Sequence, residues 1–164
     1  MSFYIKLLGL ALMLIAAIST IKGYREYVLR RISELESFIS LLSFMRGKIN
    51  RYLLPIPDII KEFSDENLKR VGFLDAVSSG KGVDRAFEGA SGRLSVGSKA
   101  KKILREAFEE LGCGYKDEVL ANVDDASENL EKILAEEKET LPKDIKVFGA
   151  VLCSAVMGVF IILA

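Results

Sequence analysis

Two long apolar runs lie at the ends of this 164-residue chain, and a region with helical periodicity lies between them. The run from Val147 to Ala164 has 18 residues without a charge, and the run from Phe3 to Ile21 has 19 residues interrupted only by Lys6. A helix of 18 residues is about 27 Å long, close to the hydrocarbon thickness of a bilayer. The pattern therefore predicts transmembrane helices over 1–21 and 147–164 and a separate domain over 22–146.

The first run also fits a cleaved secretory leader, because Ala17 and Ser19 put small residues where a signal peptidase cleaves. The residues that follow, however, are charged helix formers without a turn residue beyond Gly23. We therefore expect this run to be retained and to lead directly into a helix. The alternative is a surface-exposed helical domain with a single C-terminal anchor, whose mature chain starts near Thr20.

The first helix of the middle region is predicted from about Gly23 to Leu53. Its apolar residues recur at spacings of three and four and form one broad face; they are Val28, Ile32, Leu35, Phe38, Ile39, Leu41, Leu42, Met45 and Ile49. Pro55 and Pro57 end this helix, because proline lacks the amide donor and restrains the residue before it to extended geometry.

Four shorter helices are predicted after that break, since each apolar segment is bounded by turn or capping residues. They are expected over 57–63, over a segment that Ser64 or Asp65 caps and that reaches Val77, over 83–90, and from the N-cap Ser98 to Leu111. Residues 78–82 and 91–97 are predicted to be loops. A glycine C-cap is expected at 112–114.

The last helix of the middle region is predicted from Tyr115 onward. A three-four repeat gives it a seam that should pack on the first long helix, formed by Leu120, Val123, Leu130, Leu134 and Leu141. Pro142 is expected to interrupt this helix before the second apolar run. No segment alternates with period two for long enough to predict a strand. The predicted fold class is therefore all-α, with a bundle of about five to six helices between two transmembrane helices.

The charges that flank the apolar runs predict the topology. Lys22, Arg25, Arg30 and Arg31 follow the first run, and Lys143 and Lys146 precede the second, whereas the far side holds only Lys6 and the amino terminus. The positive-inside rule then places the middle domain in the cytoplasm. The basic residues Lys22, Arg25, Arg30 and Arg31 are predicted to lie near the membrane, where anionic headgroups attract them.

Charge is also distributed unevenly within the domain, although the formal net charge of the chain is zero. Residues 22–105 hold 17 Lys and Arg against 10 Asp and Glu, and residues 106–139 hold 3 against 12. Opposite charges on the two long helices favour their antiparallel pairing. Asp124, Asp125 and Glu128 lie far from the second apolar run, so we predict them as a binding surface for a protein partner. The alternative is a solvated acidic face.

Most catalytic chemistries are disfavoured by the composition. The chain has no histidine and no tryptophan, so no imidazole base or histidine metal ligand is available. Cys113 and Cys153 are predicted to be free thiols. The SGKG segment at 79–82 lacks the remainder of a phosphate-binding loop. Basic residues are not interleaved with aromatic ones as in a nucleic-acid platform. We predict no catalytic, cofactor or metal site, no nucleic-acid binding and no enzymatic activity.

Several segments resemble the stage III sporulation protein AB family of endospore-forming bacteria over the full chain. They are KLLG at 6–9, PIP at 55–57, FEELG at 108–112 and the closing KVFGAVLCSAVMGVFIILA. The soluble part of that family is similar to the cytoplasmic domains of the inner-membrane platform protein of type II secretion and type IV pilus systems. The GCGYKD segment at 112–117 departs from the wording usual in the family.

The resemblance implies a non-enzymatic scaffold in a complex that links mother cell and forespore. It also implies a cytoplasmic ATPase partner, stage III sporulation protein AA, other subunits of the same complex, and a place in the outer forespore membrane with the middle domain facing the mother-cell cytoplasm. Two alternatives to this function are a generic membrane-bound interaction module and a membrane-bound enzyme that uses carboxylates alone.

Overall fold

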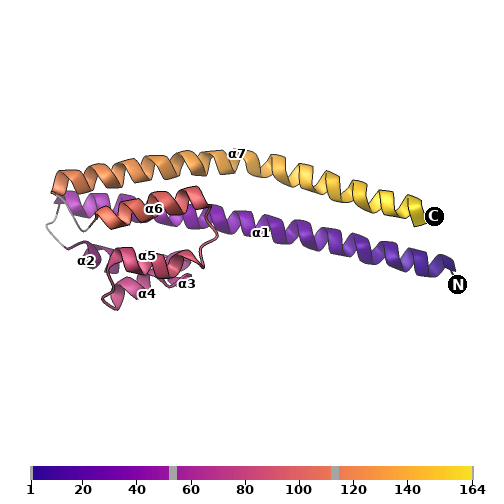
Figure 1. Ribbon diagram of the computed structural model, residues 1–164, viewed down its shortest axis with the longest axis horizontal. Helices are drawn as coiled ribbons and strands as arrows, with labels where there is room; N and C mark the ends of the chain where they lie inside the picture. The colour runs from indigo at the N-terminus through magenta and orange to yellow at the C-terminus, as the bar shows by residue number, and fades with distance from the viewer. Residues whose placement is uncertain (1, 52–54, 112–114, 164) are drawn as a thin grey trace. The chain divides into compact units, whose positions relative to one another are not determined.

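Helices form every regular element in the part of the chain that the structure describes, residues 2–51, 55–111 and 115–163. The computed structural model contains α1 (Ser2–Arg51), α2 (Ile56–Lys61), α3 (Glu66–Arg70), α4 (Phe73–Ser78), α5 (Val83–Ser91), α6 (Ser98–Glu110) and α7 (Lys116–Leu163) (Figure 1). The all-α prediction is confirmed. The chain divides into unit 1, Met1–Leu29 with Lys138–Ala164, and unit 2, Arg30–Glu137, and both long helices contribute to each.

The core of unit 2 is built on the predicted apolar face of α1. Ile32, Leu35, Phe38, Leu41, Leu42, Met45 and Ile49 are buried there, and Ile39 packs against them while partly exposed. The rest of this core comes from α2 to α7 and from the loop between α5 and α6, so the short helices and this loop cover the stripe that the sequence predicts. Burying such a stripe stabilises short helices that are marginal on their own.

Four phenylalanine rings form the centre of this core. Phe38 of α1, Phe73 of α4, Phe87 of α5 and Phe108 of α6 have ring centroids 5.2 to 6.5 Å apart in all their pairings. Most of these pairs are edge-to-face or tilted, the arrangement that the aromatic quadrupole favours. One cluster thus joins four helices.

The helix predicted to reach Val77 is two helices in the structure. Asp65 is the N-cap of α3, where its Oδ1 accepts the amide of Leu68 at 2.9 Å. Gly72 then has φ of +81° and begins α4. This left-handed conformation favours glycine and breaks the helical repeat. The division lets Leu68, Phe73 and Val77 all reach the core.

Two predictions about the start and end of α6 have different outcomes. The N-cap is Gly97 and not Ser98, whose side chain makes no capping bond, because the helix already begins at Ser98. The expected glycine C-cap at 112–114 lies outside the described residues.

The predicted seam of α7 is correct in part: Val123 and Leu130 are buried, whereas Leu141 lies outside unit 2. The buried residues are Val119, Val123, Ala126, Leu130 and Ile133, while Leu120 and Leu134 are partly buried beside them. The spacing of four and three is kept, but Ala126 occupies the central place, because a small side chain lets neighbouring helices approach closely. The expected interruption at Pro142 is wrong, since α7 continues through it.

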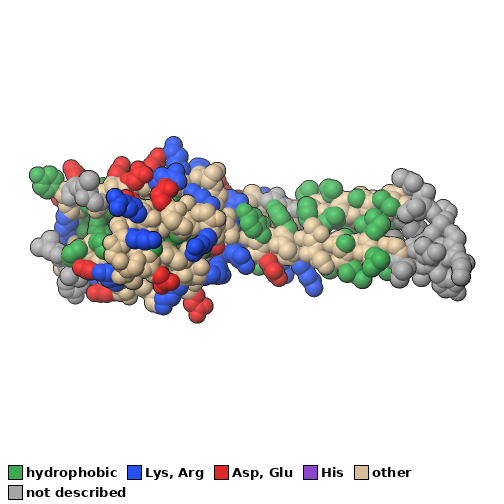
Figure 2. Space-filling model, turned by 60° about the horizontal axis from the view of Figure 1, so that its bottom comes forward, with side chains coloured by type: hydrophobic (Ala, Val, Ile, Leu, Met, Phe, Trp, Pro, Cys, Tyr) green, Lys and Arg blue, Asp and Glu red, His purple; other side chains and the backbone are tan. Residues whose placement is uncertain are grey.

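Unit 1 consists of the first part of α1 and the last part of α7. Tyr24 and Phe148 stack at 5.2 Å between ring centroids, and a Cβ on Gly149 would lie 3.9 Å from Cδ1 of Ile21. Apolar side chains nonetheless lie on its surface (Figure 2), and those more than half exposed include Leu12, Ile15, Ile18, Val147, Val151 and Met157. The two predicted transmembrane helices are not confirmed: within the described residues, no helix is long and apolar enough to cross a membrane.

Candidate functional site

The predicted acidic surface lies on the part of α7 that belongs to unit 2. Asp124 and Asp125 are successive residues and therefore point about 100° apart around the helix. Asp124 is directed toward α1, where its Oδ1 is 2.5 Å from Nε of Arg46. Asp125 is exposed and forms no ion pair with a described residue. The two aspartates thus have different surroundings, although they are adjacent in sequence.

Glu128 lies one turn beyond Asp124 and is paired within the same helix. Its Oε1 is 2.7 Å from Nζ of Lys132. The hydrogen bond from Lys132, together with its positive charge, lowers the pKa of the Glu128 carboxyl. An exposed pair of this kind is weak and leaves both side chains accessible. Asp125 is therefore the one of the three predicted carboxylates that is exposed without an ion pair to a described residue.

The predicted basic residues divide between the two units. Lys22 and Arg25 are exposed in unit 1, and Arg30 is exposed at the start of unit 2. Arg31 differs from them, because its side chain is only 33% exposed and its Nη2 lies 2.5 Å from Oε1 of Glu137, which is 12% exposed. Arg31 is therefore a structural contact between α1 and α7 and not an open surface cation.

Gly97 leaves room for this ion pair. A Cβ at position 97 would lie 2.7 Å from Nη2 and 3.3 Å from Cζ of Arg31. Its φ of −64° is open to any residue, so space and not backbone freedom favours glycine there. The loop before α6 thus packs its backbone against the guanidinium of α1.

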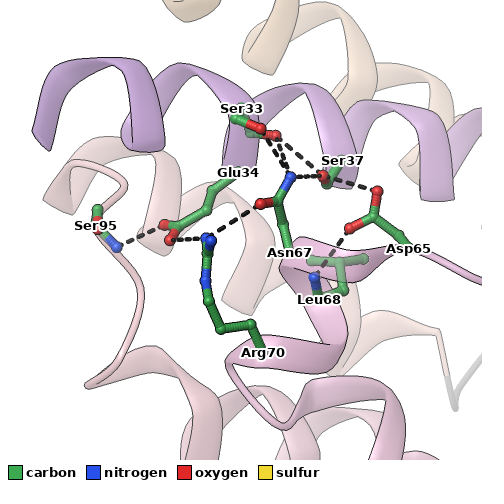
Figure 3. Close-up of polar contacts among 8 residues, drawn as sticks. All are labelled: Ser33, Glu34, Ser37, Asp65, Asn67, Leu68, Arg70 and Ser95. Carbon is green, nitrogen blue, oxygen red and sulfur yellow. Dashed lines mark hydrogen bonds and ion pairs between the residues drawn. The ribbon is translucent and has the colours of Figure 1, made fainter. Parts of the chain in front are cut away.

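A second polar cluster, which the sequence analysis missed, joins α1 to α3 and to the same loop (Figure 3). Glu34 is 1% exposed, and its Oε2 accepts the amide of Ser95 at 2.6 Å. Its other oxygen, Oε1, lies 3.5 Å from Nη2 of Arg70, which also donates to Oδ1 of Asn67 at 3.1 Å. A buried carboxylate needs such partners, because desolvation alone disfavours its charge.

Ser33 and Ser37 continue this cluster along α1. Nδ2 of Asn67 donates to Oγ of Ser33 at 2.8 Å and to Oγ of Ser37 at 3.0 Å. Oγ of Ser37 also lies 3.0 Å from Oδ2 of Asp65, the residue that caps α3 (Figure 3). The sequence carried one signal of this cluster: Ser33, Glu34 and Ser37 are polar residues within the apolar stripe of α1. These contacts fix α3 on α1.

A comparison with models of protein families shows to which family the chain belongs. The model for stage III sporulation protein AB matches residues 6–164. The chain belongs to the stage III sporulation protein AB family. The resemblance to this family seen in the sequence is thereby confirmed, whereas the match does not show the similarity to secretion platform proteins. No curated protein and no solved structure matches the chain.

Membership of this family implies a role related to sporulation, and the family is not a known enzyme family. Within the described residues of this family member, no group of three or more His, Cys, Asp or Glu side chains could hold a metal ion. Cys153 is a free, exposed thiol, and Cys113 lies outside the described residues. The accessible charged surfaces of unit 2 are the candidate functional sites that the structure offers.

Several grooves in unit 2 are lined by charged side chains, and two of them bear on the candidate surfaces. One lies between α1 and α7, contains the Arg46–Asp124 pair and has a volume of about 440 Å³. The other lies across α4 and α5 and has a volume of about 390 Å³. Its rim carries Lys81, Arg85 and Arg93. Sequence reasoning did not single out this second groove, because its basic residues come from separate segments.

Proposed function

We propose that this protein is a non-enzymatic scaffold subunit of a sporulation complex that links mother cell and forespore. In this proposal unit 1 holds the protein in the outer forespore membrane, and unit 2 faces the mother-cell cytoplasm and docks a cytoplasmic ATPase, stage III sporulation protein AA. Family membership supports the sporulation role. The platform role and the ATPase partner are what the resemblance noted in the sequence implies.

The observation that carries the membrane attachment is the exposed apolar surface of unit 1. Leu12, Ile15 and Ile18 of α1 and Val147, Val151 and Met157 of α7 are each more than half exposed. Large apolar side chains exposed in this number are unfavourable in water and favour contact with lipid or protein. Lys22, Arg25 and Arg30 supply the positive charge that favours the cytoplasmic side of a membrane.

Reporter insertion tests the topology. The 91–97 loop is unsuitable as an insertion site, because Leu94 and Val96 are buried and Ser95 is bonded to Glu34. The turn at Gly80 is suitable, since a Cβ there would meet nothing within 4 Å. We expect a reporter at Gly80 to behave as cytoplasmic and one fused after Ala164 to behave as exported. The opposite pattern contradicts the proposed topology.

The proposed ATPase contact uses the acidic surface of α7. A positively charged partner associates faster in such a field, and salt screens the effect. The informative variant is Asp125→Lys with Glu128→Lys, because Asp124 is engaged with Arg46 and its reversal would disturb the packing of α7 on α1. We expect this variant to keep its helical circular dichroism and its melting temperature but to lose ATPase capture at low ionic strength.

A matched control separates a local contact from net charge. Glu109→Lys with Glu110→Lys makes the same change of charge on exposed residues in the last turn of α6, where lysine suits the helix dipole. We expect this control to capture the ATPase as the parent does. Equal capture by the parent and the α7 variant would leave Asp125 and Glu128 as solvated charges.

A further inference from the structure

The groove across α4 and α5 is a basic surface whose cations are not neutralised by carboxylates of the described part of the chain. Lys81, Arg85 and Arg93 are exposed around it, and none of them forms an ion pair with a described residue. One carboxylate, Asp75, also lines it. Figure 2 brings this side of unit 2 forward and shows Lys and Arg side chains over it.

The floor of the groove is open because small residues form it. Gly72 and Gly89 are part of the lining, and a Cβ at Gly89 would meet nothing within 4 Å. At Gly72 a Cβ would lie 3.1 Å from Nη1 of Arg93, so this guanidinium rests on the backbone at the start of α4. Side chains of another molecule can therefore enter between the cations.

The chain itself carries the charge that fits this groove. Residues 117–136 of α7 contain seven Asp and Glu against one lysine. Asp125, Glu131 and Glu136 are exposed there and form no ion pair with a described residue. Guanidinium groups bind carboxylates with two parallel hydrogen bonds, so Arg85 and Arg93 suit these side chains.

Within unit 2 the acidic helix cannot reach the groove of its own chain. Figure 1 shows α7 along one side of α6 and α1, and α4 and α5 along the other side. A contact between the two surfaces is therefore between molecules. It joins different surfaces of the two copies, which is the head-to-tail type of interface that makes rings or rows.

We propose that the α4–α5 groove binds the acidic face of α7 of a second copy of this chain. Charge complementarity carries the contact, which makes it sensitive to salt. Confinement to a membrane surface raises the local concentration of copies and favours a contact of modest affinity. The proposal goes beyond ATPase docking, since the contact joins two copies of this chain and forms without the ATPase.

Zero-length coupling of amines to carboxylates tests it directly. The full chain in detergent micelles is mixed as equal parts of ¹⁴N and ¹⁵N protein, treated with a carbodiimide at low ionic strength, digested and examined by mass spectrometry. We expect Lys81 to be joined to Asp125, Glu128 or Glu131 in peptide pairs that carry one label of each kind. We expect the yield to fall as salt is raised.

Reversing the charge of groove residues tests whether the groove forms the contact between copies. Arg85→Glu with Arg93→Glu should lower the yield of mixed-label pairs roughly ten-fold or more, because attraction becomes repulsion on the rim. Lys99→Glu with Lys102→Glu reverses two exposed lysines of α6 and should leave the yield as in the parent. Circular dichroism confirms that each variant is folded. Mixing the groove variant with the Asp125→Lys, Glu128→Lys variant should restore coupling between the two proteins.

Three results would overturn the proposal. They are Lys81 links only between peptides of the same label, an unchanged yield in the groove variant, and mixed-label links that join the same surface of both copies. The groove variant also separates this contact from the proposed function, because its α7 is unaltered and it should still capture the ATPase. The Asp125→Lys, Glu128→Lys variant separates the two proposals as well. If it loses ATPase capture but forms mixed-label pairs as the parent does, the ATPase contact is supported and the contact between copies is contradicted.

Discussion

The buried carboxylate of Glu34 accepts the backbone amide of Ser95, 61 residues further along the chain, at 2.6 Å. This bond holds the loop between α5 and α6 against α1. Leu94 and Val96, on either side of Ser95, are buried in the core. The loop that the sequence predicts over 91–97 is therefore a packed part of the bundle. Ser95 bonds to Glu34, and Gly97 lies against Arg31.

Removal of the Glu34 carboxylate tests this arrangement. Glu34→Met keeps the approximate volume but leaves the amide of Ser95 without its acceptor. We expect a loss of about 1–3 kcal/mol in the free energy of unfolding. Hydrogen exchange at the Ser95 amide should become faster in the folded protein. Glu131→Met, an exposed position on α7, is the matched control and should change neither quantity appreciably.

The Arg31–Glu137 pair should stabilise unit 2 more than an exposed pair does. We expect Glu137→Leu to cost about 1–2 kcal/mol, discounted from a fully buried pair because Arg31 is one-third exposed. A double-mutant cycle with Arg31→Met, followed by thermal unfolding, measures the coupling. The exposed Lys102–Glu106 pair on α6 should give about 0.3–0.5 kcal/mol in the same kind of cycle. Equal couplings would show that the burial of Arg31 has no effect.

Leu35 and Leu130 lie in the two predicted seams and are fully buried. Replacing either by Ala should lower the free energy of unfolding by about 2–5 kcal/mol, through lost transfer free energy and the cavity left behind. Leu29→Ala, at a position 44% exposed, is the control and should cost much less. A shift of less than a degree or two in the thermal melt of either seam variant would show that the core is centred elsewhere.

Gly72 should be required for its backbone conformation. Gly72→Ala places a Cβ on a residue with φ of +81°, and we expect a cost of about 1–2 kcal/mol. Gly47→Ala lies inside α1, where a Cβ meets nothing within 4 Å, and should stabilise the fold by about 0.5–1 kcal/mol. Thermal unfolding of the two variants should therefore move the midpoint in opposite directions.

The Glu128–Lys132 pair gives an expected pH dependence. Its carboxyl pKa is lowered in the folded state, first by the hydrogen bond from Lys132 and then by its charge. The stabilisation is therefore present above the ordinary pKa of 4.5 and is lost as pH falls through the lower folded value. Lys132→Met should raise the pKa of Glu128 in a side-chain NMR titration. Lys132→Arg, which keeps the charge, should leave it lowered.

The sequence predicted the helices well because apolar spacing on one face determines both the helix and its orientation. The stripe from Ile32 to Ile49, the stop at Pro55 and the helices over 83–90 and 98–111 follow from local chemistry. The division at Gly72 did not, because a single glycine is compatible with a continued helix. The seam of α7 was identified only in part, because Ala126 carries too little apolar area to stand out and its burial depends on the neighbouring helix.

The candidate sites were less predictable for a related reason. Charge count located the acidic segment, but the pairing of Asp124 with Arg46 depends on helices that are 78 residues apart in sequence. The basic groove draws on α4, α5 and the loop after them, and no local motif reports that combination. Glu34 was visible in the stripe of α1, yet its partner Ser95 comes from a loop.

The four-ring cluster of Phe38, Phe73, Phe87 and Phe108 also sets the order of events during synthesis of the chain. At about 5–20 residues per second, a ribosome needs roughly 4–14 s to extend the nascent chain from Phe38 to Phe108. Throughout that time the apolar face of α1 lacks the partners that cover it in the folded protein, because they have not yet been synthesised. Once it emerges, the helix is therefore a substrate for chaperones or for the membrane surface until α6 has also left the ribosome, and a pause in translation at that later point should favour correct folding over aggregation.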